Sequence, residues 1–391
     1  MLTFCQTPAY RNAMNEAKKR IALAVTLAEP GGVQSFLLEL AHHLVQDGHE
    51  VTVIAGDGQW LEQKLLGTPI HFLRLKHMHR SIHATKDLLA IFELTRIFQA
   101  NKFDAVHLNS SKMGIIGSIA ARIAKIPRTV YRIGGWVFLE PLSTWRKNLY
   151  IRLERWTARF KDSIICVHPG DVEVAKRFGI KPKKELIAIP NGIRFDAFEQ
   201  NLKSRNDARH ELNLPLDTFI FGTVANFYPV KNIPGYLEAC AEFKQTHPVS
   251  LFIIMGDGPE YALIEERIKE LDLQDHVILT GNRDNASELL RAFDAFVLPS
   301  TKEGMSWSLL EAMATGLPCI ATDVGAARWM LEPNSGMIVT PKNSTQLAEA
   351  MSRIADDVAF RDQLGQNAKK AVRDRFPLEE TLAGNVRSLL D

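Results

Sequence analysis

Long hydrophobic runs are missing from this sequence of 391 residues. A helix that spans a bilayer needs about 20 consecutive apolar residues, and here charged residues interrupt every apolar stretch well before that length. The sequence therefore predicts that the chain is not an integral membrane protein. The first twenty residues also lack the basic-then-apolar order and the cleavage site of a signal peptide, so we expect a cytoplasmic protein.

Cysteine is scarce as well. The spacing of the cysteines fits neither a disulfide framework nor a structural zinc site, so we expect buried thiols. The remaining composition, with 46% hydrophobic and 24% charged residues, is that of an ordinary globular protein and excludes a disordered or fibrous chain. Because a single core rarely exceeds about 250 residues, the length predicts two domains. The four cysteines are Cys5, Cys166, Cys240 and Cys319.

Positive and negative charges are divided unequally between the two halves of the chain. Residues 1–190 contain 27 Lys and Arg against 16 Asp and Glu, whereas residues 191–391 contain 20 against 29. A basic N-terminal half indicates an anionic partner, such as a phospholipid surface or a phosphorylated ligand. Solvated surface charge is the alternative interpretation.

Short apolar segments alternate with amphipathic segments along the whole chain. Residues 21–26 form an apolar run, Gly31-Gly32 follows, and apolar residues then recur at helical spacing over residues 33–46. A second apolar run covers residues 50–55, which completes a parallel strand-helix-strand unit. Repetition of this unit predicts a parallel sheet covered by helices on both faces.

A Pro-Asn-Gly turn signal at residues 190–192 precedes a polar stretch, and a second series of strands and helices begins at residue 219. We therefore predict two doubly wound α/β domains, residues 1–192 and residues 193–391. The C-terminal tail is helical by pattern and is interrupted by Pro377, and it can return to the first domain.

The most informative stretch is STKEGMSWSLLEAMA, residues 300–314. Glu303 follows a strong strand signal, at the end of the strand where open parallel sheets bind ligands, and Glu311 lies about two turns into the next helix. Between them, the amides of residues 304–308 fall at a helix N-terminus, which suits a diphosphate. The carboxylate of Glu311 can accept two hydroxyls of a ribose. The alternative is a capping role for Glu303 and a surface position for Glu311.

Two more loops in the same half follow strand ends, residues 225–232 with Lys231 and the Gly-Asp-Gly-Pro turn at residues 256–259. These strand ends are expected to converge on one crevice. With these features together, the sequence resembles the retaining glycosyltransferases of family 4 over nearly its whole length. The supporting motifs are Gly31-Gly32, HLNSSKMG at residues 107–114, IPNG at 189–192, the Lys231 loop, GDGP at 256–259, GNR at 281–283 and the Glu303–Glu311 box.

The resemblance implies the GT-B fold, with two Rossmann-like doubly wound parallel-sheet domains that face each other across a cleft. It implies that Lys231 pairs with the donor diphosphate and stabilises the leaving group, that Glu303 contacts the transferred sugar and that Glu311 holds the ribose. Lys231 and Glu303 are then the catalytic residues. The implied donor-binding residues are Gly31, Gly32, Asn226, Lys231, Gly256, Asn282, Arg283, Glu303, Gly304, Met305, Ser306, Ser308, Leu309 and Glu311.

Several positions depart from the pattern of the family, and one of these departures is Ala327-Arg328-Trp329 in place of a common Pro-Glu. Gly134 stands where many relatives have a histidine near the donor sugar, and Asn226 stands where many have an arginine five residues before the phosphate lysine. Arg194 replaces the usual acid after Asn-Gly-Ile. We expect the phosphate charge to depend more on Lys231, with Arg132 as a hypothetical substitute. A retaining transfer, in which the departing phosphate takes the acceptor proton, needs no protein base, so activity is still expected.

The segment from Trp145 to Lys161 places Trp145, Tyr150 and Trp156 among six positive charges. This composition suits an anionic membrane interface, with Arg152, Arg155 and Arg159 as the expected acceptor or membrane contacts. Packing against the first domain is the alternative.

No convincing Asp-x-Asp signature is present, so we expect no metal and no other cofactor, and we expect no nucleic-acid partner.

The leading hypothesis is therefore a metal-independent, retaining transfer of a hexose or N-acetylhexosamine from a nucleoside diphosphate sugar, with uridine as the expected base. The expected acceptor is a lipid-linked glycan of surface polysaccharide assembly, reached by a cytoplasmic protein that binds peripherally to the inner face of the plasma membrane. Two alternatives stay open. One is a soluble sugar or sugar-phosphate acceptor, and the other is a donor-binding protein without turnover.

Overall fold

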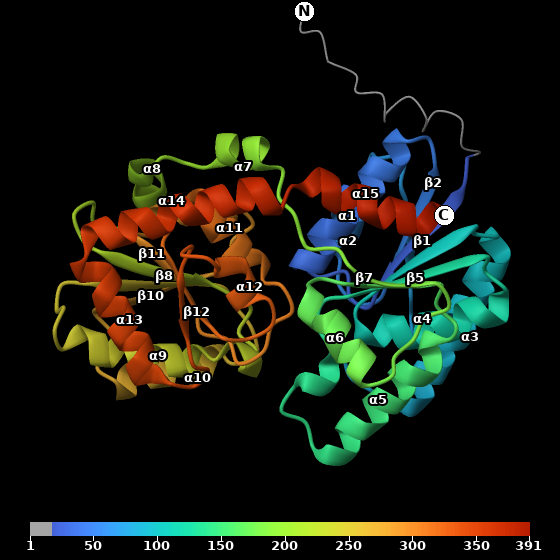
Figure 1. Ribbon diagram of the computed structural model, residues 1–391, viewed down its shortest axis with the longest axis horizontal. Helices are drawn as coiled ribbons and strands as arrows, with labels where there is room; N and C mark the ends of the chain where they lie inside the picture. The colour runs from blue at the N-terminus through green and yellow to red at the C-terminus, as the bar shows by residue number, and fades with distance from the viewer. Residues whose placement is uncertain (1–17) are drawn as a thin grey trace, which may run out of the picture. The chain divides into compact units, whose positions relative to one another are not determined.

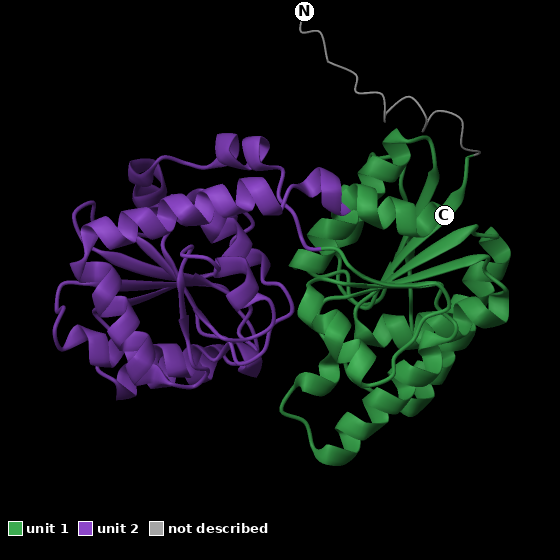
Figure 2. Cartoon of the chain, viewed as in Figure 1, with its two compact units in different colours: residues 1–189, 382–391 green, residues 190–381 purple. Residues whose placement is uncertain are grey.

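The computed structural model describes residues 18–391, which divide into two compact units (Figures 1 and 2). One unit contains the chain up to Ile189 together with Leu382–Asp391, and the other contains Pro190–Thr381. The first unit's main segment ends at Ile189, three residues before the boundary expected after Gly192. The expectations for the first twenty residues and for Cys5 fall largely or wholly outside the described residues, whereas Cys166, Cys240 and Cys319 are buried free thiols as expected.

The first unit is built on a parallel sheet of seven strands in the order β3-β2-β1-β4-β5-β6-β7. Central strands such as β4 and β5 are buried along their full length, as expected for a parallel sheet with helices on both faces. The strands are β1 (Arg20–Val25), β2 (Glu50–Ala55), β3 (His71–Arg74), β4 (Ala105–Asn109), β5 (Arg128–Ile133), β6 (Ser163–Cys166) and β7 (Glu185–Ala188).

Helices connect these strands and pack their apolar stripes on the sheet. In the first helix, Phe36, Leu37, Leu40, Ala41 and Leu44 are buried at the three-to-four spacing read from the sequence. The helices of this unit are α1 (Gly32–Gln46), α2 (Trp60–Leu65), α3 (Ala84–Asn101), α4 (Ser111–Ala124), the 3₁₀ turn η3 (Val137–Leu139), α5 (Thr144–Ala158) and α6 (Pro169–Arg177).

The second unit repeats the architecture with a six-stranded sheet in the order β10-β9-β8-β11-β12-β13. All of its paired strands run parallel. The strands are β8 (Ile220–Val224), β9 (Leu251–Met255), β10 (Val277–Gly281), β11 (Ala295–Leu298), β12 (Cys319–Thr322) and β13 (Met337–Val339).

Nine α-helices are assigned to residues 195–390, together with two 3₁₀ segments. They are α7 (Phe195–Asn201), α8 (Arg205–Glu211), η4 (Pro229–Lys231), α9 (Ile233–Lys244), α10 (Tyr261–Glu270), η5 (Ala286–Ala292), α11 (Trp307–Thr315), α12 (Ala327–Leu331), α13 (Ser344–Asp356), α14 (Val358–Arg375) and α15 (Leu378–Leu390).

The strand order places the topological switch point of the second sheet between β8 and β11. The chain leaves β8 toward β9 on one side, and it later enters β11 on the other side of β8. Open α/β sheets bind ligands outside the carboxyl ends of the two strands at such a point. The loops that follow β8 and β11 are the loops with Lys231 and Glu303.

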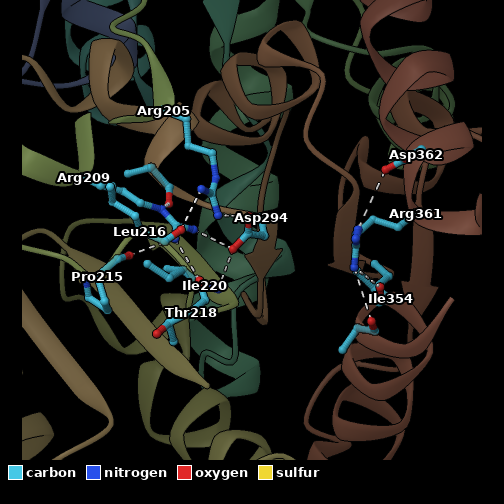
Figure 3. A network of polar contacts seen from close by, with 12 residues as sticks. Arg205, Arg209, Pro215, Leu216, Thr218, Ile220, Asp294, Ile354, Arg361 and Asp362 are labelled. Atoms are coloured by element: carbon cyan, nitrogen blue, oxygen red, sulfur yellow. Dashed lines mark hydrogen bonds and ion pairs between the residues drawn. The ribbon is translucent and has the colours of Figure 1, made fainter. Parts of the chain in front are cut away.

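A buried arginine ties together the opposite ends of the same two strands (Figure 3). Arg209 is fully buried and donates to the carbonyls of Pro215, Leu216, Thr218 and Ala292, and also to Asp294 Oδ2 at 2.7 Å. The same carboxylate oxygen accepts the backbone N–H of Ile220. Arg209 and Asp294 therefore hold β8, β11 and the loop after α8 in place.

The last ten residues of the chain belong to the first unit. Asn385 is buried and its Oδ1 lies 3.0 Å from His107 Nε2 on β4. Arg128 donates to the Ser388 carbonyl, and Lys19 donates to the Leu390 carbonyl. The C-terminal part of α15 is therefore fixed to the first sheet by polar contacts as well as by packing.

Candidate active site

The loops after β8, β9 and β10 form a continuous hydrogen-bonded floor at one edge of the second sheet. Phe227 N–H donates to the Asp257 carbonyl at 2.8 Å, and Gly256 N–H donates to the Gly281 carbonyl at 2.9 Å. Gly256 has a φ of +148°, and a Cβ there would stand 1.8 Å from the Ala225 carbonyl oxygen. Only glycine fits this close approach of two backbones, which explains the Gly-Asp-Gly motif.

Lys231 and Glu303 meet across the switch point. The Lys231 Nζ lies 2.7 Å from Glu303 Oε1, and Ser300 Oγ donates to the same oxygen at 2.7 Å. The two loops are also joined through their backbones, because Thr301 N–H donates to the Val230 carbonyl at 2.7 Å. The structure therefore brings together the two side chains that the sequence singled out as catalytic.

Helix α11 begins beside this pair with a row of unused amides. Ser306 is the N-cap, and its Oγ accepts the N–H of Leu309 at 3.3 Å. The backbone N–H groups of residues 304–308 donate to no acceptor within residues 18–391. Backbone donors of this kind, together with the positive end of the helix, form an anion-binding site.

The backbone of the loop before α11 is held from two sides. Ala326 N–H donates to the Gly304 carbonyl at 2.7 Å, and Asn191 Nδ2 donates to the Met305 carbonyl at 2.9 Å. A Cβ at Gly325 would lie 2.3 Å from the Gly304 oxygen, so the 325–326 turn can approach this closely only as glycine. Asn191 and Gly325 are parts of the site that the sequence analysis did not assign.

Glu311 lies in the second turn of α11. It is partly exposed, and burial raises the pKa of its carboxyl to about 7. Within residues 18–391 its side chain makes no hydrogen bond or ion pair. A half-buried carboxylate without a protein partner can accept hydrogen bonds from a ligand hydroxyl at low desolvation cost.

Three other expected donor-binding residues of the second unit are Asn226, Asn282 and Arg283. Asn226 is exposed in the loop after β8. Arg283 Nη1 lies 3.9 Å from Glu211 Oε1 on α8, and its Nε is buried without an acceptor. The Arg283 side chain therefore leans toward α8, and donor binding by Asn282 and Arg283 stays a prediction.

The expected contacts of the first unit surround the switch point between β1 and β4. Gly31 is the N-cap of α1 and Gly32 is its first residue. Thr26 Oγ1 lies 2.6 Å from Ser110 Oγ, which joins the loops after β1 and β4. Gly134 is exposed, and a Cβ there would meet no atom within 4 Å, so the missing histidine is not explained by lack of space.

Arg132 does not occupy a position suited to compensating the phosphate charge, the substitute role expected for it. It is 3% exposed, its guanidinium lies 4.0 Å from the Phe36 ring centroid, and burial lowers its pKa to about 9. Its neighbour His107 is fully buried, and burial followed by the Arg132 charge lowers the histidine pKa to about 3. Both side chains are core elements of the first unit.

Helix α5 presents the expected basic residues on its exposed side. Arg152, Arg155 and Arg159 are all exposed, and Arg155 is tied to the Phe178 carbonyl by two hydrogen bonds of 3.0 and 2.8 Å. Trp145 and Trp156 share the exposed side, with 64% and 45% of their surfaces accessible. No helix in residues 18–391 has the length and apolar content needed to cross a bilayer.

Two doubly wound units, with Lys231, Glu303 and the N-terminus of α11 at the switch point of the second, are the arrangement expected of a two-domain glycosyltransferase. Comparison with known families agrees. Residues 30–197 match the model described as Glycosyltransferase Family 4, and residues 204–371 match the model described as Glycosyl transferases group 1. The chain belongs to glycosyltransferase family 4.

Relatives with curated names cover most of the chain. It is 29% identical, over 92% of its own length and 94% of the relative, to the UDP-Gal:alpha-D-GlcNAc-diphosphoundecaprenol alpha-1,3-galactosyltransferase of Escherichia coli. It is 30% identical, over 70% of its length and 67% of the relative, to the putative teichuronic acid biosynthesis glycosyltransferase TuaC of Bacillus subtilis (strain 168).

Solved structures confirm the GT-B fold. Anabaena Alr3699/HepE, solved in complex with UDP and glucose, matches with a TM-score of 0.80 at 20% identity, over 95% of this chain and 99% of that one. WaaG, a glycosyltransferase involved in lipopolysaccharide biosynthesis, matches with a TM-score of 0.77 at 19% identity, over 94% and 99% of the two chains.

Proposed function

We propose that this glycosyltransferase moves a hexose or N-acetylhexosamine from a UDP-sugar to a membrane lipid-linked glycan in surface polysaccharide assembly, with retention and without a metal. The observation that carries the proposal is the ion pair of Lys231 with Glu303, the residue that directly precedes the free amides of residues 304–308 at the same switch point. A diphosphate placed there gains a lysine charge and several backbone donors at once.

The proposed chemistry follows from the charges at this position. The bond between the anomeric carbon and the UDP oxygen breaks as negative charge grows on the diphosphate, and Lys231 with the α11 amides stabilises that charge. The acceptor oxygen bonds to the same face of the sugar, and its proton passes to the departing phosphate oxygen. Because a lysine and a helix N-terminus supply the positive charge, we propose that no divalent ion is required.

Lys231 is paired with Glu303 before the donor binds. A donor diphosphate competes for the ammonium, and Glu303 is then free to accept a hydroxyl of the transferred sugar. Glu311, whose carboxyl has no protein partner within residues 18–391, is proposed to accept the two ribose hydroxyls. The proposed roles of Glu303 and Glu311 thus rest on the pairing of one carboxyl with Lys231 and on the unpaired position of the other.

The names of relatives support the choice of donor and acceptor. The Escherichia coli relative transfers galactose from UDP to a diphosphoundecaprenol-linked sugar, and relatives in Rhizobium meliloti and Staphylococcus aureus are named for lipopolysaccharide core and capsular polysaccharide biosynthesis. The exposed tryptophans and arginines of α5 are proposed to bind the anionic membrane that holds such an acceptor.

The proposal is tested with purified protein, a panel of UDP-sugars and an N-acetylglucosaminyl diphosphopolyprenol acceptor in EDTA. We expect transfer from at least one UDP-sugar, with the anomeric configuration of the donor retained in the product. Transfer only to water-borne sugars or sugar phosphates would favour the soluble acceptor. If the protein binds UDP but never releases UDP from any UDP-sugar, even with membrane extract, it is a donor-binding protein without turnover.

A further inference from the structure

Asn191 lies on the first of the two chain segments that connect the units. The second unit starts at Pro190, and residues 190–193 run beside the segment that leads into α15. Ile193 N–H donates to the Phe376 carbonyl at 2.9 Å, and Thr381 Oγ1 donates to the Pro190 carbonyl at 3.0 Å. A Cβ at Gly192 would stand 2.5 Å from Thr381 Oγ1, so the two segments are closely packed.

From this segment Asn191 reaches the loop that carries the free amides. Its side chain is 2% exposed, its Nδ2 donates to the Met305 carbonyl at 2.9 Å, and its backbone N–H points to Met305 Sδ at 3.2 Å. Met305 is itself buried. One residue of the connecting segment thus contacts Met305 through both its backbone and its side chain.

The contact fixes the direction of an amide. In a trans peptide group the C=O and N–H bonds point in opposite directions, so a Met305 carbonyl held toward Asn191 turns the Ser306 N–H away from Asn191. The Ala326 bond to the Gly304 carbonyl acts in the same way on the Met305 N–H. Both N–H groups belong to the row of amides without a protein acceptor.

We propose that Asn191 is a positioning residue for donor binding, because its side-chain amide orients the Met305–Ser306 peptide toward the donor diphosphate. The inference rests on the proposed function, since it needs a diphosphate at the α11 amides. Under this inference, Asn191 couples the segment that connects the units to the loop that carries the free amides of residues 304–308. Replacing the amide with a carboxylate turns a donor into an acceptor that faces the Met305 oxygen.

The test is isothermal titration with UDP on Asn191→Asp and Asn191→Ala. We expect about tenfold weaker UDP binding in each, the size of one lost charge-assisted hydrogen bond, with a raised KM for the donor and an unchanged KM for the acceptor. Thr381→Val is the matched control, because it removes a side-chain bond within the same pair of segments without touching Met305. It should bind UDP like the wild type.

The wild-type protein offers a second test that does not depend on folding of the variants. UDP should slow hydrogen exchange in residues 304–308 and, through Asn191, in residues 191–193. Two results would overturn this inference but not the proposed function. One is wild-type UDP affinity in both Asn191 variants, and the other is slowed hydrogen exchange in residues 304–308 without any slowing in the connecting segment. If Lys231→Met and Glu311→Ala also keep full UDP affinity, the proposed function itself fails.

Discussion

The Lys231 ammonium and the Glu303 carboxylate lie 2.7 Å apart although they belong to loops that follow different strands, β8 and β11. Both strands flank the switch point of their sheet, so the pair stands where a doubly wound sheet binds its ligand. The pair neutralises two partly buried charges in the protein without a donor. It also keeps the lysine beside the amides that begin α11.

Lys231→Met is expected to slow transfer more than it weakens UDP binding. Methionine keeps the length of the side chain but removes the charge that stabilises the leaving diphosphate, which is worth about a hundredfold in kcat. Steady-state kinetics with saturating donor, together with UDP titration, separates the two effects. The control is Lys269→Met, at an exposed position of α10 in the same unit, which should leave both kcat and UDP affinity unchanged. An equal loss of kcat in the two variants would contradict the role of Lys231.

Glu311 is expected to make UDP binding depend on pH. Partial burial raises the pKa of its carboxyl to about 7, and only the ionised form accepts both ribose hydroxyls. UDP affinity should therefore fall by about tenfold from pH 8 to pH 6. The diphosphate also titrates, so the same series on Glu311→Gln gives the part that belongs to the ligand. Equal slopes for the wild type and Glu311→Gln would exclude the carboxylate from the ribose site.

The raised pKa of Glu311 also has a consequence for stability. The folded protein favours the neutral carboxyl, so this group contributes stability at low pH that is lost as the pH rises from the ordinary glutamate value through about 7. Glu311→Gln should accordingly stabilise the ligand-free protein above pH 7 and change little near pH 4. Urea unfolding at the two pH values measures the difference.

The exposed side of α5 is expected to bind anionic vesicles. The double variant Arg152→Ala/Arg159→Ala should lower the partition onto phosphatidylglycerol vesicles by at least about tenfold, since each basic residue near such a surface contributes about 1 kcal/mol. Added salt should lower the wild-type partition as well. Lys64→Ala/Lys181→Ala removes the same charge from other exposed positions of the unit. An identical loss in both double variants would indicate a general charge effect instead of a docking face.

Arg209→Met is expected to destabilise the second unit by about 3–5 kcal/mol, because it removes the buried charge partner of Asp294 and leaves several carbonyls without their donor. Arg205 contacts the same Asp294 from an exposed position, at 3.2 Å. Arg205→Met should therefore cost less than about 1 kcal/mol. Urea titrations of the two variants measure the contrast, and comparable losses would mean that the buried network in Figure 3 does not hold the two strands.

The parallel sheets and the central features of the site could be predicted because they follow local rules. Apolar strands alternate with amphipathic helices, and the carboxyl ends of parallel strands share one edge, so Lys231, Glu303 and the amides after Gly304 had to lie near one another. Helices α7 and α8 escaped detection because they are short and lie in a polar stretch, without an apolar period to mark them. The edge strands β3 and β13 are similarly short and only partly buried.

Other features depend on how distant segments pack. Asn191 and Met305 are 114 positions apart, and their contact is set by the path of the connecting segment. The pKa of Glu311 depends on the burial of one face of α11, and no pattern within the helix distinguishes that face from a surface face. Arg132, near the end of β5, was the hypothetical substitute for phosphate charge compensation, but its side chain packs on Phe36 instead.

The central claim is that one diphosphate is held by both Lys231 and the amides that begin α11. A crystal structure of the protein with UDP tests it most directly. We predict phosphate oxygens within hydrogen-bonding distance of Lys231 Nζ and of at least two N–H groups in residues 304–308. A diphosphate bound away from those amides, with Lys231 still paired to Glu303, would contradict the account.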